Sequence, residues 1–88
     1  MKTFPLVISS PDGDVFREQV IKISLRGTEG DLAVLAGHVP FVTTVKPGTV
    51  EITKADESVL SGTVDGGILT VSSEGTTLIS GTFQENKI

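Results

Sequence analysis

The 88-residue chain has a mass of 9.2 kDa, which suffices for one small domain and not for two, so we expect residues 1–88 to form a single domain. With 38% hydrophobic and 20% charged residues, the chain is too apolar to remain disordered. Its formal net charge of -4 and its lack of Trp and Tyr disfavour nucleic acid and carbohydrate as partners. The absence of Cys excludes disulfides, thiolate metal sites and cysteine nucleophiles.

The sequence shows no membrane-spanning or secretory pattern. No stretch approaches the roughly 20 apolar residues that cross a bilayer. Residues 1–5 lack the continuous apolar region of a secretory signal. We therefore expect the protein to lie on the cytosolic side of the membrane.

Strand patterns begin at residues 20–26, where Ile21, Ile23 and Leu25 alternate with polar residues and are predicted to face a core. The run at residues 32–36 is apolar on both faces of a strand. One face of that run therefore either meets another subunit or lies covered within the monomer, and the pattern alone does not choose between these two arrangements.

Further strands are predicted towards the C-terminus. Residues 49–53 alternate in the same way as the first strand, and residues 69–71 and 77–79 indicate two more strands. Glycine turns at residues 66–67 and 74–75 bound these later strands.

Ten glycines and four prolines interrupt any helical periodicity, and turn signals recur every eight to twelve residues. This spacing is typical of sandwiches and barrels. We expect an all-β fold of about nine or ten strands, packed as two antiparallel sheets with essentially no helix.

His38 is the only histidine of the chain and lies in a predicted turn at residues 37–40. A lone imidazole cannot assemble a metal site without other ligands. The serines occupy ordinary strand or turn positions, with no sign of a base that would activate one as a nucleophile. We therefore expect no catalytic residue and no metal, and we interpret His38 as a hydrogen-bonding residue of a turn or an interface.

Glu29 and Asp31 place two carboxylates at a glycine-framed loop, residues 27–30. The loop lacks the Lys and Ser/Thr of a phosphate-binding loop, and its carboxylates would repel phosphate. It is either a solvated turn or a contact for a basic surface.

Three segments in order, RGTEGDL at residues 26–32, GHVP at residues 37–40 and KPG at residues 46–48, resemble the N-terminal domain of the epsilon subunit of the rotary, proton-translocating ATP synthase. SPDG at residues 10–13 and GGIL at residues 66–69 extend the resemblance over nearly the whole chain. Ala36 departs from the family, which often has Pro before the Gly-His pair.

The resemblance implies a β-sandwich of two five-stranded sheets, with ten strands in all. It also implies a non-catalytic central-stalk subunit, without cofactors, that links the gamma subunit to the membrane c-ring and couples proton transport to ATP synthesis. Such a chain would be a peripheral subunit at the cytoplasmic face of the bacterial inner membrane, reach the membrane only through the complex, and be monomeric when isolated.

By position in the matched motifs, the resemblance implies that Glu29 and Asp31 face the c-ring and that Ser10, His38 and Thr43 face gamma. The family continues into a C-terminal helical hairpin that can inhibit ATP hydrolysis, whereas this sequence ends soon after Phe83, so we expect no self-inhibition through it. From the residues alone, a stand-alone sandwich that binds a peptide or small ligand is the alternative.

Overall fold

The computed structural model describes residues 2–27 and 30–86. Within these ranges the chain forms nine strands and no helix, so the predicted all-β class is confirmed. No helix that could cross a bilayer is found among them. The strands are β1 (Phe4–Ser10), β2 (Gly13–Gly27), β3 (Gly30–Leu35), β4 (Phe41–Val45), β5 (Gly48–Lys54), β6 (Val59–Val64), β7 (Gly67–Ser72), β8 (Gly75–Ser80) and β9 (Phe83–Glu85).

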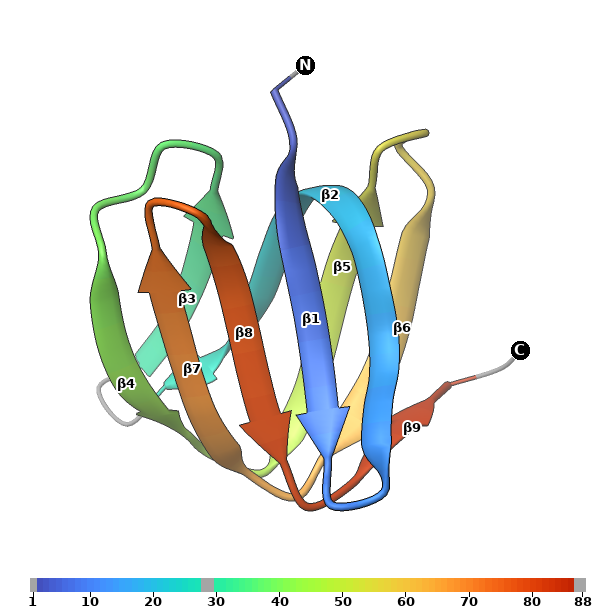
Figure 1. The fold of residues 1–88 in the computed structure, drawn as a ribbon. Helices are drawn as coiled ribbons and strands as arrows, with labels where there is room; N and C mark the ends of the chain where they lie inside the picture. The colour runs from blue at the N-terminus through green and yellow to red at the C-terminus, as the bar shows by residue number, and fades with distance from the viewer. Residues whose placement is uncertain (1, 28–29, 87–88) are drawn as a thin grey trace.

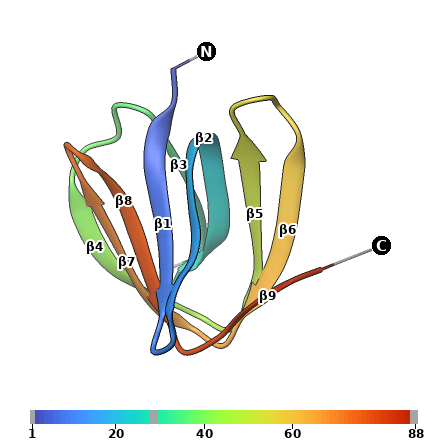
Figure 2. The same ribbon diagram turned by 45° about the vertical axis from the view of Figure 1, so that its right-hand side comes forward.

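The strands lie in two facing layers (Figure 1 and Figure 2). One layer, here called the front layer, contains β4, β7, β8, β1 and the first half of β2. The back layer contains β3, the second half of β2, β5, β6 and β9. Because the 15-residue β2 runs through both layers, nine strands supply two five-stranded layers. The expectation of ten strands in two separate sheets is therefore wrong in detail, since β2 joins the layers into one sheet.

The sheet is mixed rather than wholly antiparallel. β1 and β8 are parallel, with Leu6 opposite Thr76 and Ser9 opposite Ile79, whereas the remaining described pairs are antiparallel. The direction of β1 is set by its hairpin with β2, and that of β8 by its hairpin with β7. The expected antiparallel pairing fails at this one place because no hairpin connects β1 to β8.

A register shift between Val20 and Lys22 allows β2 to change layers. Val20 and Ile23 are both fully buried although they stand three positions apart, and Ile21 between them is only half-buried. An extra residue in a strand switches the face of every residue that follows it. Ile21 is therefore not the core residue that simple alternation predicts, while Ile23 and Leu25 are.

Aliphatic and aromatic side chains from both layers fill the core. The predicted inward residues of β5, Val50 and Ile52, are confirmed because neither has exposed surface, and Leu69 of the predicted strand β7 is also fully buried. On β8, a strand predicted from residues 77–79, Leu78 is fully buried and Ile79 is 53% exposed. The buried apolar residues are Phe4, Leu6, Ile8, Phe16, Val20, Ile23, Leu25, Val34, Val45, Val50, Ile52, Val64, Leu69, Val71 and Leu78.

β3 forms an edge of the back layer, and its pairing in the described part of the chain is with β2. Val34 points into the core, Leu32 is half-buried, and Ala33 and Leu35 are exposed. The apolar run at residues 32–36 is therefore not a central strand covered on both faces within the monomer. The outward face of this run, with Ala33 and Leu35, is exposed to solvent.

The predicted turn at residues 66–67 joins β6 to β7 and requires glycine. Gly66 has a φ of +106°, which side chains rarely adopt, and a Cβ on it would lie 3.1 Å from the carbonyl oxygen of Val45. A Cβ on Gly67 would lie 2.0 Å from the carbonyl oxygen of Ile79. These glycines let β7 pack closely against its neighbours in the front layer.

Candidate interaction surfaces

The outward residues of β1, β4, β7 and β8 carry no charge, whereas the first half of β2 places the exposed Arg17 opposite Val7 at the margin of the same layer. Val42 is 67% exposed, Ile79 53% and Ile68 46%, and Ile68 pairs directly with Ile79. Threonines and other neutral residues surround these three side chains. We call this surface the uncharged face, and it consists of Pro5, Val7, Ser9, Val42, Thr44, Ile68, Thr70, Ser72, Thr77 and Ile79.

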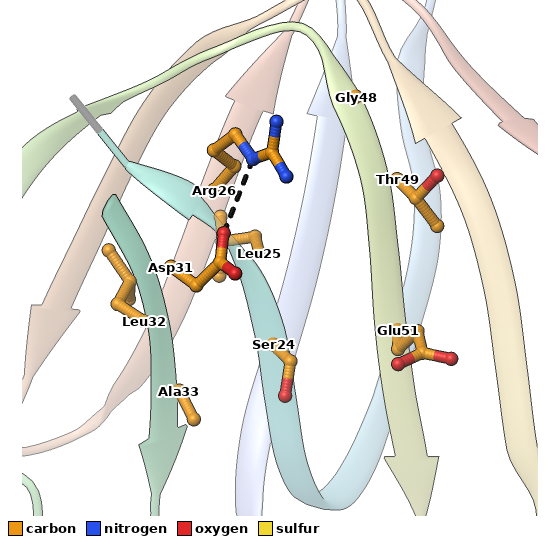
Figure 3. A pocket seen from close by; sticks show the side chains of 9 residues that line it. All are labelled: Ser24, Leu25, Arg26, Asp31, Leu32, Ala33, Gly48, Thr49 and Glu51. Atoms are coloured by element: carbon orange, nitrogen blue, oxygen red, sulfur yellow. Dashed lines mark hydrogen bonds and ion pairs between the residues drawn. The ribbon is translucent and has the colours of Figure 1, made fainter. Parts of the chain in front are cut away.

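The outer surface of the back layer differs because it is charged. Arg26 of β2 lies opposite Asp31 of β3, and Glu51 of β5 lies opposite Ser24 of β2. These side chains line a shallow groove of about 560 Å³ that also includes Thr49 (Figure 3). The two outer faces of the sandwich therefore offer different chemistry to partners.

Asp31 lies where β3 begins, at the end of the sandwich that also holds the β1–β2 and β6–β7 turns (Figure 1). Its carboxylate Oδ1 is 3.2 Å from Nε of Arg26, and the two side chains are 81% and 64% exposed. The ion pair neutralises Asp31 locally, which the sequence did not reveal. Glu29, the other predicted ring contact, lies outside the described residues.

Other carboxylates at this end brace turns. The Ser80 hydroxyl donates to Asp65 at 3.0 Å and the backbone N–H of Thr82 donates to the same oxygen at 3.2 Å. The Ser80 hydrogen bond, followed by the Thr82 N–H, holds the pKa of Asp65 below its usual value. In the β1–β2 hairpin, a hydrogen bond from Ser9 and then one from Arg17 lower the pKa of Asp14.

The three predicted gamma contacts occupy separate places. Ser10 is half-buried in the β1–β2 turn, where its hydroxyl donates to the Gly13 carbonyl at 3.2 Å. His38 lies at the opposite end of the sandwich, in the connection between β3 and β4 (Figure 1). Its Nδ1 lies 2.8 Å from the Val39 carbonyl oxygen and its ring packs on Phe41 with centroids 4.9 Å apart.

Thr43, the third of these residues, faces a groove at the side of the sandwich rather than the uncharged face. This side groove has a volume of about 470 Å³ and lies between the edge strands β3 and β4. Asp31 lines the same groove. The structure therefore brings together one predicted ring contact and one predicted gamma contact.

Neither a metal centre nor a catalytic cluster is evident where the structure is defined. No group of three or more His, Asp or Glu side chains in residues 2–27 and 30–86 is placed to hold a metal ion. His38 is close to a backbone carbonyl and an aromatic ring, and neither of them is a nucleophile. The arrangement can bind other proteins through its outer faces and its edge strands.

Comparison with known proteins places the fold in a family. The family model described as "ATP synthase, Delta/Epsilon chain, beta-sandwich domain" matches residues 3–86. The chain belongs to this family. Because the match covers most of the chain, the resemblance noted in the sequence is confirmed.

Curated relatives agree with the family match. The sodium-ion-specific ATP synthase epsilon chain of Acetobacterium woodii is 39% identical over 79 residues, which are 90% of this chain and 59% of the relative. The ATP synthase epsilon chain of Bacillus pumilus is 38% identical over 80 residues, which are 91% of this chain and 60% of the relative. The chain thus spans about three-fifths of the length of these relatives.

Solved structures share the fold. A chain in the Euglena gracilis mitochondrial ATP synthase structure of OSCP, F1 and c-ring superposes with a TM-score of 0.89 at 24% identity, over 94% of this chain and 53% of that one. A chain in the central stalk and c-ring structure of Tetrahymena thermophila mitochondrial ATP synthase gives 0.78 at 11% identity, over 93% and 66% of the two chains.

Sequence reasoning missed the uncharged face. The signal was present, because every outward position of β7 and β8 holds Ile, Thr, Ser or Gly. Recognising it required the pairing of β1, β4, β7 and β8 side by side, and the β1–β8 pairing joins segments about 70 residues apart. No local pattern indicates such a neighbour.

Proposed function

We propose that this chain acts as the β-sandwich of an ATP synthase epsilon chain, a non-catalytic central-stalk subunit that links the gamma subunit to the c-ring. The single observation that carries the proposal is the uncharged face, found on a member of a family of ATP synthase chains. Through this link, ion flow at the ring would be coupled to ATP synthesis in the catalytic head. The complex is membrane-associated, and we place the chain at its cytoplasmic side.

The uncharged face is suited to a lasting protein contact. Burying its aliphatic side chains removes apolar surface from water, which stabilises a complex by about 25 cal/mol per Å². No charged side chain among these outward residues has to be desolvated, a step that often cancels the gain from an ion pair. A contact of about 800 Å² per partner would take roughly one-seventh of the chain's 5281 Å² surface. We assign this face to gamma.

The end of the sandwich that carries Asp31 is proposed to meet the c-ring, together with Glu29. The Arg26 partner reduces the net charge of Asp31, so this contact is expected to depend on hydrogen bonding and shape more than on long-range attraction. Ser10 and His38 lie at the two ends of the front layer, where a subunit covering that layer would meet both. Thr43 would meet gamma at the side groove.

A strand-rich sandwich also suits a part that transmits torque. β1 pairs with neighbours on both sides, and β2 crosses from one layer to the other, so the layers are connected through the backbone as well as through the core. Force applied to one outer face is therefore passed to the other through backbone hydrogen bonds. The alternative of a stand-alone ligand-binding module has less support, because the named relatives are ATP synthase epsilon chains.

Titration with purified gamma subunit tests the proposal. Ile68→Asp places a charge at the centre of the uncharged face, and we expect it to weaken binding at least tenfold, since a buried unpaired charge is costly. Glu51→Arg changes a charge on the opposite face and should leave the affinity within about threefold. Equal effects of the two changes, or no binding by the unmodified chain at low and moderate salt, would contradict the proposal.

A further inference from the structure

β4 is an exposed edge strand without the usual protection. It pairs with β7 along its length and touches β2 at one position, Val45 opposite Gly27; no other described strand pairs with it. In both views it forms the outer margin of the front layer (Figure 1 and Figure 2). Its sequence, Phe41–Val45, contains four β-branched residues and neither a charge nor a proline. Edge strands that remain free in solution usually carry charges, prolines or bulges.

The other edges of the sheet, namely β3, β9 and the free side of the first half of β2, are short or carry charges. β3 begins with Gly30 and Asp31, and the Asp31 carboxylate is paired with Arg26. β9 has only three residues and ends in Glu85. β4 is therefore the described edge that is best suited to pairing with another chain.

The register shows which backbone groups of β4 are available. The N–H of Lys46 donates to the carbonyl of Arg26 at 2.9 Å, so at this point the backbone of the strand points towards β2. Because backbone groups alternate along a strand, those of Thr44 and Val42 point to the same side. The side groove lies along that side, between β4 and β3, with Leu32, Phe41 and Thr43 in its lining.

We propose that β4 accepts an added β-strand from the neighbouring central-stalk subunit, antiparallel or parallel, with backbone hydrogen bonds at Val42 and Thr44. This inference rests on the proposed function and adds the mode of contact. The added segment would be uncharged and rich in β-branched residues, to match the composition of β4 itself. Val42 lines the groove and also belongs to the uncharged face, so one partner would cover both without a break.

A proline substitution distinguishes a partner that forms backbone hydrogen bonds with β4 from one that only covers its side chains. Val42→Pro removes an N–H that points away from β7 and should be tolerated, because proline is accepted on the free side of edge strands. Val42→Ala is the matched control, since it also shortens the side chain and keeps the N–H. We expect Val42→Pro to bind purified gamma at least tenfold more weakly than Val42→Ala, with similar melting temperatures for the two variants. Equal affinities would overturn the proposal.

Amide hydrogen exchange on the unmodified chain provides a second measurement. In the free chain, the amides of Val42 and Thr44 should exchange quickly and that of Thr43, which faces β7, slowly. Binding of gamma should slow exchange at Val42 and Thr44 by at least tenfold. Tight binding without such slowing would overturn strand addition and leave the proposed function standing, whereas absence of binding would overturn both. A homodimer that Val42→Pro dissociates would also overturn it, because the edge would then accept a second copy of this chain.

Discussion

Neighbouring residues on β8 offer a sharp test of which side chains form the core. Leu78 is fully buried, whereas Ile79 is 53% exposed on the uncharged face. Leu78→Ala and Ile79→Ala each remove three carbon atoms from the same strand. Because Ile favours strands more than Leu does, a larger loss for Leu78→Ala reports burial rather than strand propensity.

The magnitudes follow from the two environments. At about 0.8 kcal/mol per buried methylene, Leu78→Ala loses roughly 2.4 kcal/mol of transfer free energy, and the cavity left behind raises the cost to about 2–5 kcal/mol. Ile79→Ala loses about half as much, roughly 1 kcal/mol, and leaves no cavity because water fills the space. For a chain of this size each kcal/mol corresponds to about 4–8 °C in melting temperature.

Thermal and urea unfolding followed by circular dichroism measures both variants. We expect Leu78→Ala to melt at least about 10 °C below the unmodified chain and Ile79→Ala only a few degrees below it. Ile79→Ala should in turn weaken gamma binding, since that side chain lies on the uncharged face. Equal losses of stability, or a larger loss for Ile79→Ala, would refute the assignment of the two faces.

Three further predictions concern Asp31, Asp65 and Gly62. Asp31→Lys should change the free energy of unfolding by less than about 0.5 kcal/mol, because the ion pair is exposed, while weakening c-ring binding in a pull-down; a large drop in melting temperature would show instead that Asp31 stabilises the fold. Because the pKa of Asp65 is lowered, its contribution to stability is present above its ordinary value near 3.8 and is lost as the pH falls through the lowered pKa. Asp65→Asn should therefore lower the melting temperature at pH 7 and have little effect at about pH 2; equal effects at both pH values would contradict this. Gly62→Ala would place a Cβ 2.5 Å from the Phe83 ring, so we expect β9 to detach and the Asn86 amide to exchange faster, whereas unchanged exchange would show that the ring can move aside.

Much of the fold could be predicted because local patterns determine it. Alternation identified β5 and the second half of β2, and the glycines at residues 66–67 marked the β6–β7 turn, which requires glycine. The strand count was harder to predict. A register shift at Val20 lets one long strand serve both layers, and such a shift adds a single residue that alternation cannot distinguish from noise.

The interaction surfaces were less predictable than the core. The Arg26–Asp31 pair joins residues opposite each other across the β2–β3 pairing, and it became visible only with the register. The parallel contact between β1 and β8 brings Val7 beside Thr77, and with it completes the uncharged face. A binding partner leaves no periodic pattern in the sequence. A binding surface is therefore recognised only when the strand pairing shows which residues are neighbours.

Site-specific crosslinking in the assembled complex shows which outer face of the sandwich meets gamma. The chain contains no Cys, so a single introduced thiol is unique. Thr70→Cys places it on the uncharged face and Ser61→Cys on the outer face of the back layer, and both replace half-buried hydroxyl residues on strands. With a short thiol-reactive crosslinker, we expect a product with gamma from position 70 and none from position 61. Crosslinking to gamma from position 61 alone, or from neither position in an intact complex, would contradict this expectation.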